Sequence, residues 1–201
     1  MKVNEIFYSL QGEGYYSGTP AVFVRFSGCN LCCPFCDTQH EHGREMSEEE
    51  IVAEVAKYPA KHVVITGGEP SLQLTESLVN KLHTAGKYVA VETNGTHPLP
   101  ENVDWITLSP KNAFVAGAEV VLPRADEIKV IYDALHDPAT QLSTFHLSPL
   151  TSHLSPFTFL QPCDTGDAAK NRQLTAATVE YIKSHPQWRL SLQIHKILDI
   201  Q

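Results

Sequence analysis

Short hydrophobic runs alternate along the chain with segments in which apolar residues recur every three or four positions. The runs predict β-strands over residues 2–8, 21–26, 62–66, 88–92, 105–109, 127–132, 157–161 and 190–195. Helices are expected over residues 47–56, 75–85 and 171–184, the first opened by a capping-box sequence at Ser47 and the second closed by Gly86. Because several strands are apolar at consecutive positions, the pattern favours an α/β fold of parallel βαβ units buried on both faces.

Polar and glycine-rich segments fall where the predicted strands end. They are the cysteine-containing loop after residue 26, Gly67-Gly68-Glu69-Pro70, Glu92-Thr93-Asn94-Gly95-Thr96, Ser109-Pro110-Lys111 and Gln161-Pro162. In parallel α/β folds, ligands bind at the carboxyl ends of the strands. We therefore expect one mouth of the fold to carry the functional site.

One segment departs from the alternation of strands and helices. His146-Leu147-Ser148-Pro149 is repeated at 153–156, and the prolines at 138, 149 and 156 argue against a long helix. We expect residues 137–156 to form an irregular surface insertion without a chemical role. The length of 201 residues otherwise suits a single domain over 1–201.

Composition narrows the class of partner. The net charge is −8, whereas proteins that bind nucleic acid through its phosphates usually carry a basic surface. No run of 18 apolar residues predicts a membrane span, and the first residues lack a signal-peptide pattern. We expect a soluble cytoplasmic protein that acts on a small molecule, with no nucleic acid and no membrane as partner.

Four of the five cysteines lie close together, at positions 29, 32, 33 and 36. In a cytosolic protein, so tight a group favours metal binding over disulfides. Thiolates from Cys29, Cys33 and Cys36 suit an iron–sulfur cluster, and a four-iron cluster held by three cysteines keeps one iron open to another ligand. If Cys32 rather than Cys33 were the middle ligand, the spacing would be x2 followed by x3, so the sequence leaves the choice between these two cysteines undecided. A zinc site that uses all four thiolates is the alternative to a cluster.

The spacing Cys29-x3-Cys33-x2-Cys36, with Phe35 before the last cysteine, resembles the radical S-adenosylmethionine superfamily. Gly67-Gly68-Glu69-Pro70 matches that superfamily's glycine-rich segment. Over nearly its whole length the chain further resembles the 7-carboxy-7-deazaguanine synthase family, in segments 7–14, 25–31, 36–38, 92–96, 109–111, 161–162 and 195–196. The resemblance implies an incomplete, (β/α)6-type radical SAM partial barrel with parallel strands.

The resemblance also implies the reaction and its cofactors. It implies a carbon–nitrogen lyase that rearranges 6-carboxy-5,6,7,8-tetrahydropterin to 7-carboxy-7-deazaguanine with loss of ammonia, in queuosine-type 7-deazapurine biosynthesis. The implied cofactors are a [4Fe–4S] cluster, S-adenosyl-L-methionine and Mg²⁺. A homodimer and a flavodoxin or ferredoxin electron donor are the implied partners. The alternatives are a glycyl-radical-enzyme activase, which carries the same cysteine spacing, and a zinc-stabilised binding module without catalysis.

Site residues follow from the matching motifs. Cys29, Cys33 and Cys36 would bind the cluster and Thr38 would bind Mg²⁺. The implied substrate-binding residues are Leu10, Gln11, Gly12, Glu13, Arg25, Thr93, His195 and Gln201. The implied cofactor-binding residues are Phe35, Asp37, Gly67, Gly68, Glu69, Gly95, Ser109, Pro110, Lys111 and Gln161. Arg25 suits the substrate carboxylate because its fork can bond both oxygens, whereas a histidine packed in the core is the alternative for His195. No side chain is assigned as catalytic, since the radical is generated on the cofactor.

Overall fold

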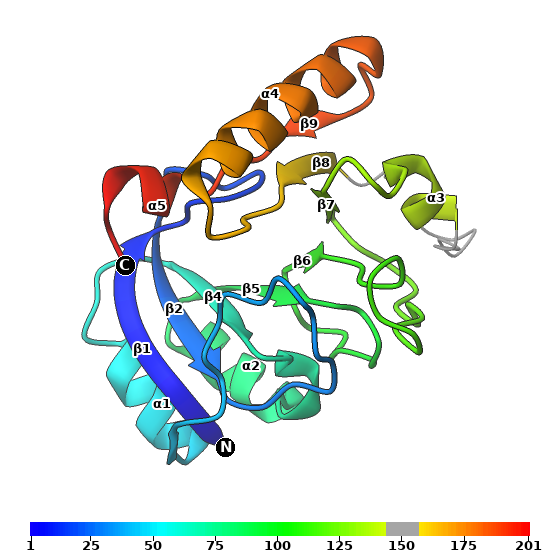
Figure 1. Cartoon of the computed structure of the whole chain (residues 1–201). Helices are drawn as coiled ribbons and strands as arrows, with labels where there is room; N and C mark the ends of the chain where they lie inside the picture. The colour runs from blue at the N-terminus through cyan, green and yellow to red at the C-terminus, as the bar shows by residue number, and fades with distance from the viewer. Residues whose placement is uncertain (144–156) are drawn as a thin grey trace.

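The structure is a computed structural model, and it describes residues 1–143 and 157–201 of the protein. Nine strands form one sheet, in the order β3-β1-β2-β4-β5-β6-β7-β8-β9. The strands are β1 (Lys2–Leu10), β2 (Pro20–Phe26), β3 (Arg44–Glu45), β4 (His62–Gly67), β5 (Tyr88–Thr93), β6 (Trp105–Leu108), β7 (Glu127–Tyr132), β8 (Phe157–Pro162) and β9 (Arg189–Leu190). From β2 to β9 each strand pairs in parallel with the next one in this order. Figure 1 shows the sheet curving around an interior, which confirms the predicted α/β partial barrel.

Two features of the strands differ from the prediction. β1 and β3 are antiparallel additions at one edge, so the sheet is not parallel throughout. Residues 190–195 do not form one strand, because only Arg189–Leu190 pairs with β8 and a helix begins at Ile194. The alternation of apolar and polar residues in 190–195 imitates a strand, but tertiary contacts described below decide the outcome.

The helices are α1 (Glu48–Val55), the 3-10 turn η1 (Pro70–Leu72), α2 (Glu76–Thr84), α3 (Pro138–Ser143), α4 (Ala168–Ser184) and α5 (Ile194–Leu198). The predicted capping box is confirmed, since the Glu50 backbone N–H donates to Ser47 Oγ and the Ser47 N–H donates to Glu50 Oε2. Thr75 caps α2 by accepting the Leu78 N–H at 3.1 Å. The segment expected to be irregular, 137–156, begins with α3, and its remainder with the repeated His-Leu-Ser-Pro sequence lies outside the described residues.

The two faces of the curved sheet bury different side chains because successive strand residues point to opposite sides. On the outer face, Val22, Val24 and Phe26 of β2 are inaccessible to solvent and belong to the same core as Ile51 of α1 and Leu78 of α2. Burial of each such side chain contributes roughly 1.5–3 kcal/mol. This outer core therefore holds the helices against the barrel.

The interior of the barrel changes from apolar to polar toward the carboxyl ends of the strands. An apolar layer contains Phe7, Ala21, Phe23, Val64 and Ala90. One step further along the strands stands a row of polar residues. It consists of Arg25, Thr66, Glu92 and Thr107. Arg25 of β2 is the register partner of Thr66 of β4, and Glu92 of β5 is the register partner of Thr107 of β6. Thr66 Oγ1 donates a hydrogen bond to Glu92 Oε2 at 3.2 Å. The polar row forms the base of a cavity at this end of the barrel.

The β1–β2 loop closes the opposite end. Tyr15 stacks on Phe157 with ring centroids 4.6 Å apart and lies 5.1 Å from Trp105, and Tyr16 lies 4.5 Å from the His62 ring. His62, Trp105 and Phe157 are the first residues of β4, β6 and β8. This aromatic packing fixes the loop under the barrel. Across the described parts of the chain, none of the helices has the length and apolar character that crossing a membrane requires.

Candidate active site

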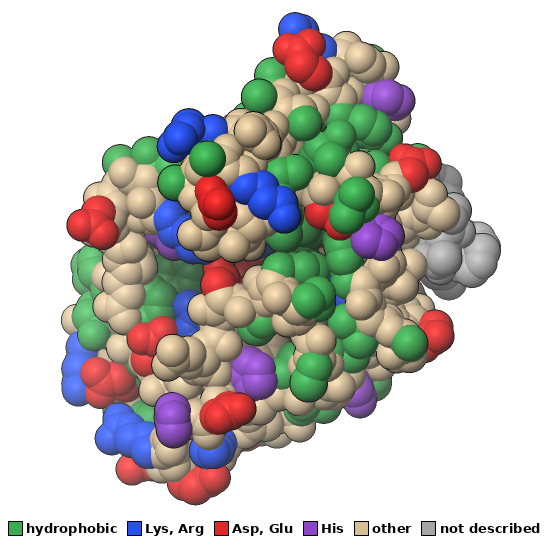
Figure 2. Space-filling model, viewed as in Figure 1, with side chains coloured by type: hydrophobic (Ala, Val, Ile, Leu, Met, Phe, Trp, Pro, Cys, Tyr) green, Lys and Arg blue, Asp and Glu red, His purple; other side chains and the backbone are tan. Residues whose placement is uncertain are grey.

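One cavity of about 630 Å³ lies at the carboxyl ends of the parallel strands. Figure 2 shows this face of the molecule hollowed between the C-terminal helices and the lower part of the sheet. Three predicted site residues, Glu69, Gly95 and Pro110, do not line it. The other predicted residues all do: Leu10, Gln11, Gly12, Glu13, Arg25, Cys29, Cys33, Phe35, Cys36, Asp37, Thr38, Gly67, Gly68, Thr93, Ser109, Lys111, Gln161, His195 and Gln201.

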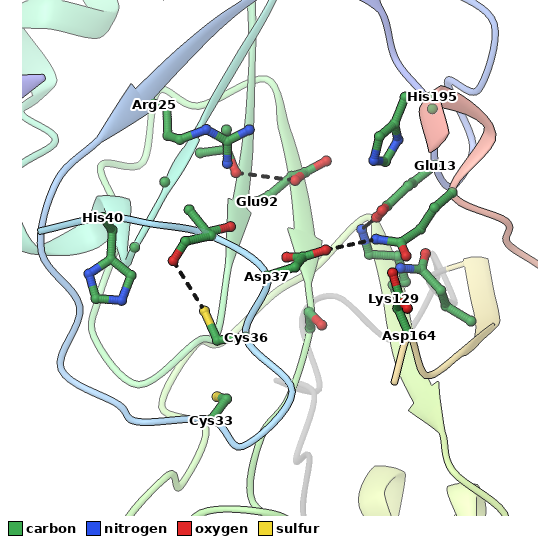
Figure 3. Close-up of a pocket in the computed structure, with 18 of the residues that line it drawn as sticks. Glu13, Arg25, Cys33, Cys36, Asp37, His40, Glu92, Lys129, Asp164 and His195 are labelled. Atoms are coloured by element: carbon green, nitrogen blue, oxygen red, sulfur yellow. Dashed lines mark hydrogen bonds and ion pairs between the residues drawn. The ribbon is translucent and has the colours of Figure 1, made fainter. Parts of the chain in front are cut away.

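The cysteine loop follows β2 and forms one wall of the cavity. Cys29, Cys33 and Cys36 line the cavity, whereas Cys32 is exposed and does not. The Leu31 N–H points at Cys29 Sγ at 3.4 Å, and the Cys36 thiol lies 3.7 Å from the Thr38 carbonyl oxygen. This placement favours Cys33 over Cys32 as the middle member of the set. Figure 3 shows Cys33 and Cys36 on this loop, across the cavity from His195.

These thiols fit an iron–sulfur cluster better than a single metal ion. Of the four clustered cysteines, three line the cavity and Cys32 lies outside it, so the fourth sulfur of a zinc site is not placed with the others. Structural zinc needs four sulfurs about 2.3 Å from one centre, whereas a cluster is bound through separate irons. Burial raises the pKa of the Cys29 and Cys33 thiols, so their thiolate forms need a cationic partner such as cluster iron.

The Gly-Gly turn after β4 packs directly against the cysteine loop. A Cβ at Gly67, whose φ is +136°, would lie 2.1 Å from the Phe26 carbonyl oxygen, and a Cβ at Gly68 would lie 2.0 Å from the Gly28 oxygen. The Glu69 N–H donates to that Gly28 oxygen at 2.8 Å. Both glycines are therefore required for the close approach that joins this turn to the cysteine loop.

Glu69 does not line the cavity and is inaccessible to solvent. Its Oε1 accepts hydrogen bonds from the Ser71 N–H (3.0 Å), Ser71 Oγ (2.6 Å) and Thr93 Oγ1 (2.6 Å), and its Oε2 accepts the Asn94 N–H at 2.7 Å. The carboxylate thus connects the turn after β4 with the end of β5. Through the bonds from Thr93 and Asn94, Glu69 holds these two residues in place on the cavity wall.

Gly95 and Pro110 also lie behind the cavity surface. A Cβ at Gly95, whose φ is +80°, would lie 2.4 Å from Leu108 Cδ1, so the glycine permits close packing of the turn on β6. Pro110 is buried between two residues that line the cavity, Ser109 and Lys111. Both residues shape the turns that carry their neighbours.

The start of the β1–β2 loop enters the cavity from the barrel side. Gln11 donates from Nε2 to Glu92 Oε1 at 2.9 Å, and its Oε1 accepts the Glu13 N–H at 3.1 Å. Glu13 forms a buried ion pair with Lys129 of β7. Gly12 lies against α5, where a Cβ would be 2.3 Å from His195 Nδ1. The loop therefore presents an amide and a carboxylate to the cavity with their orientations fixed.

Arg25 belongs to the polar row at the base of the cavity. Its Nε pairs with Glu5 Oε1 at 2.8 Å, and its guanidinium carbon lies 5.9 Å from the centre of the Phe7 ring. Gln201 donates to the other Glu5 oxygen at 2.9 Å. Figure 3 shows the Arg25 guanidinium directed into the cavity, where its planar fork is placed for an anionic group.

Lys111 is a partly buried cation that lines the cavity and acts electrostatically on the Cys33 thiol. It donates to the carbonyl oxygen and to the hydroxyl of Ser109, both at 2.6 Å. Burial lowers the pKa of Lys111 to about 8, while the Cys33 thiol acts in the opposite direction. On β8, Gln161 Oε1 accepts the Ser191 hydroxyl at 2.9 Å, which fixes the amide at the cavity edge.

The C-terminal helix α5 closes one side of the cavity. The Lys196 ammonium contacts Asp37 Oδ2 at 2.7 Å and Asp164 Oδ2 at 2.6 Å, and the Ile194 N–H donates to the Gly12 oxygen at 3.0 Å. These contacts join α5 to the cysteine loop, to the end of β8 and to the β1–β2 loop. They explain why a helix forms where the sequence pattern predicted a strand.

Several cavity residues received no individual role from the sequence. Thr66, Thr107 and Lys129 lie inside strands, and Asp164 follows Gln161-Pro162. Glu92 and Lys196 belong to matching segments, but the sequence assigned neither of them a function. For Lys129 a signal was present, because a lysine in the middle of the apolar strand 127–132 needs a buried anionic partner.

Comparison with known proteins agrees with this geometry. Residues 23–132 match the model of the radical SAM superfamily. Over its full length the chain is 54% identical to the 7-carboxy-7-deazaguanine synthase of Bacteroides thetaiotaomicron, of which it covers 98%. It is 39% identical to the synthase of the same name from Burkholderia multivorans, with 98% of each chain covered.

Among solved structures, QueE from Escherichia coli superposes with a TM-score of 0.71 at 31% identity, covering 95% of this chain and 92% of that one. Streptococcus suis SuiB shares the fold alone, with a TM-score of 0.52 at 12% identity, covering 85% of this chain and 48% of that one. These matches decide against the glycyl-radical activase and the non-catalytic zinc module. The chain therefore belongs to the 7-carboxy-7-deazaguanine synthase family of the radical S-adenosylmethionine superfamily.

Proposed function

We propose that this enzyme is a radical S-adenosylmethionine lyase that converts 6-carboxy-5,6,7,8-tetrahydropterin to 7-carboxy-7-deazaguanine with loss of ammonia. One observation carries the proposal. A single cavity joins a wall of three cysteines to an arginine at its base and to a loop that presents an amide and a carboxylate. The 54% identity to a synthase of that name supports the same assignment.

The chain's own residues have binding and shielding roles. Arg25 would pair with the substrate carboxylate, and Glu5 on its Nε orients the guanidinium for that contact. Gln11 and Glu13 would bind the hydrogen-bonding edge of the pterin ring. The α5 helix, fixed by Lys196, would exclude water from the side of the cavity next to His195.

The cofactors would occupy the opposite wall. We assign the cluster to Cys29, Cys33 and Cys36, and S-adenosylmethionine to the surface that includes Gly68 and Lys111. When bound, the reduced cluster and S-adenosylmethionine supply the radical that removes hydrogen from C6 of the pterin. The protein's part is to hold C6 in the cavity near that chemistry.

Four further assignments accompany this function. Mg²⁺ would be held by Thr38, whose hydroxyl is a hard oxygen ligand at the edge of the cysteine loop. Flavodoxin or ferredoxin would deliver the electron to the cluster, and the enzyme would act as a homodimer. A cytoplasmic location fits cysteines that form no disulfide, since thiols persist in a reducing compartment.

An anaerobic turnover reaction tests the function. Enzyme reconstituted with iron and sulfide is mixed with dithionite, Mg²⁺, S-adenosylmethionine and 6-carboxytetrahydropterin, and the products are measured by mass spectrometry. We expect 5′-deoxyadenosine together with a product lighter than the pterin by one ammonia. Deoxyadenosine without that product would retain the radical chemistry and refute the substrate. Repetition without Mg²⁺ and with Thr38→Val tests the magnesium assignment separately.

A further inference from the structure

Lys129 is a buried cation on the inner face of β7 to which the functional assignment above gives no role. Its side chain is 7% exposed and lines the cavity. Its ammonium contacts Oε2 of Glu13, whose side chain is 13% exposed, from a position 116 residues further along the chain. Burial of an unpaired charge at this depth would cost free energy, so the lysine ammonium is stabilised by its acidic neighbours.

The Glu13 carboxylate is the point at which three elements meet. Lys129 approaches from β7, while Gln193 of the segment before α5 and His195 of α5 lie close enough to lower the pKa of the carboxylate. Burial raises the pKa of Glu13, but the Lys129 ammonium, together with Gln193 and His195, outweighs burial and leaves the pKa below its usual value. Glu13 is therefore an anion in the folded protein at neutral pH.

An ionised carboxylate accepts hydrogen bonds on both oxygens and donates none. The Lys129 ammonium donates to Oε2 of Glu13 and so fills one acceptor position of the carboxylate. The backbone of Glu13 is held separately, because its N–H donates to Gln11 Oε1. The remaining acceptor directions suit a ring edge that carries two adjacent N–H donors. The 2-amino group and N3–H of a 2-amino-4-oxopyrimidine are such donors, and a 2,4-dioxopyrimidine lacks the amino group.

We propose that Lys129 is a positioning residue that keeps Glu13 an oriented, acceptor-only group and thereby makes the site selective for a 2-amino-4-oxopyrimidine ring. The inference rests on the proposed function, because it deepens the description of how that site recognises its pterin. Lys129 acts through Glu13 rather than on the reacting atoms. Its removal should therefore change ring selectivity through Glu13 and should not change the cluster.

The test measures the binding of two stable probes, 6-carboxypterin and 6-carboxylumazine, to the cluster-loaded enzyme in the presence of S-adenosylmethionine. Lumazine carries an oxo group in place of the pterin 2-amino group. We expect the wild type to bind the pterin at least 30-fold more tightly, because mismatched polar groups in a buried site are rejected strongly. In Lys129→Met the preference should fall below fivefold, and the KM for 6-carboxytetrahydropterin should rise at least tenfold with kcat within threefold. Lys183→Met, which removes an exposed lysine of α4, is the matched control and should leave both quantities unchanged.

A double-mutant cycle separates action through Glu13 from a general structural role. If Lys129 works through Glu13, Glu13→Gln and the double variant Glu13→Gln/Lys129→Met should show the same probe preference within twofold. The double variant also replaces both charges with neutral groups, which protects folding if Lys129→Met alone leaves Glu13 uncompensated. A further tenfold loss on adding Lys129→Met to Glu13→Gln would overturn the inference, as would an unchanged probe preference in Lys129→Met.

The outcomes also separate this inference from the proposed function. A wild type that produces no 7-carboxy-7-deazaguanine refutes the function. A wild type that turns the pterin over, with Lys129→Met retaining wild-type KM and ring preference, refutes only the role of Lys129.

Discussion

Replacement of Glu69 by glutamine tests whether the Gly-Gly-Glu-Pro carboxylate organises the site or contacts the cofactor. Glu69 is inaccessible to solvent, and four hydrogen-bond donors from Ser71, Thr93 and Asn94 surround its two oxygens. Glutamine has the same shape but only one acceptor oxygen. In its less costly orientation the amide keeps the three bonds at Oε1 and places an NH₂ group against the Asn94 N–H.

The expected cost follows from that single mismatch. A hydrogen bond to a charged group contributes roughly 1.5–3 kcal/mol, and a buried donor without a partner costs roughly 1–3 kcal/mol. Glu69→Gln should therefore destabilise the fold by about 3–5 kcal/mol. In a protein of this size about 1 kcal/mol corresponds to roughly 2–4 °C, so the unfolding temperature should fall by about 6–20 °C.

Thermal unfolding of the cluster-loaded enzyme under anaerobic conditions, followed by circular dichroism, measures this shift. Glu119→Gln makes the same chemical change at an exposed loop position and should leave the unfolding temperature within about 2 °C. The reasoning is refuted if Glu69→Gln unfolds like Glu119→Gln while the KM for S-adenosylmethionine rises tenfold. That result would mean that Glu69 binds the cofactor instead of supporting the end of β5.

Three further changes have defined outcomes. Burial raises the pKa of Glu127 to about 7, so its stabilising contribution is complete below the ordinary value of 4.5 and is lost as the pH rises through 7. Glu127→Gln should flatten the decline in unfolding temperature between about pH 5 and pH 8. Gly12→Ala would place a Cβ 2.9 Å from the backbone nitrogen of His195, so hydrogen exchange in α5 should accelerate and the pterin KM should rise at least tenfold. Cys32→Ser should keep the brown colour and iron content of the reconstituted enzyme, whereas Cys33→Ser should lose both, and the reverse result would make Cys32 the cluster ligand.

Much of the fold could be predicted from local patterns. The strand over 127–132 and the capping box at Ser47 appear where the sequence predicted them, because hydrophobic runs and capping residues act over a few positions. Residues 190–195 were predicted wrongly, because their alternation satisfies a strand locally. Contacts of α5 with Gly12 and Asp37, both distant in sequence, outweigh that local preference.

The site shows the same division. Motifs located the cysteine loop, Arg25 and the strand ends, since each is recognisable from residue type and spacing alone. They assigned Glu69 to the cofactor contacts, but they did not predict the hydrogen bonds that its buried carboxylate accepts from Ser71, Thr93 and Asn94. They also overlooked Lys129, whose importance depends on which face of β7 lines the barrel.

By itself, the sequence determined most of the strands and helices in their order, the largely parallel α/β class and the chemistry available at each strand end, because these depend on neighbouring residues. Only the tertiary structure decided which strand faces turn inward and which distant charges meet, as in the pair Glu13–Lys129. Strand periodicity defines two faces without saying which one the closed sheet will bury around a cavity. A buried ion pair exists only after the barrel has brought both of its members out of water and into contact.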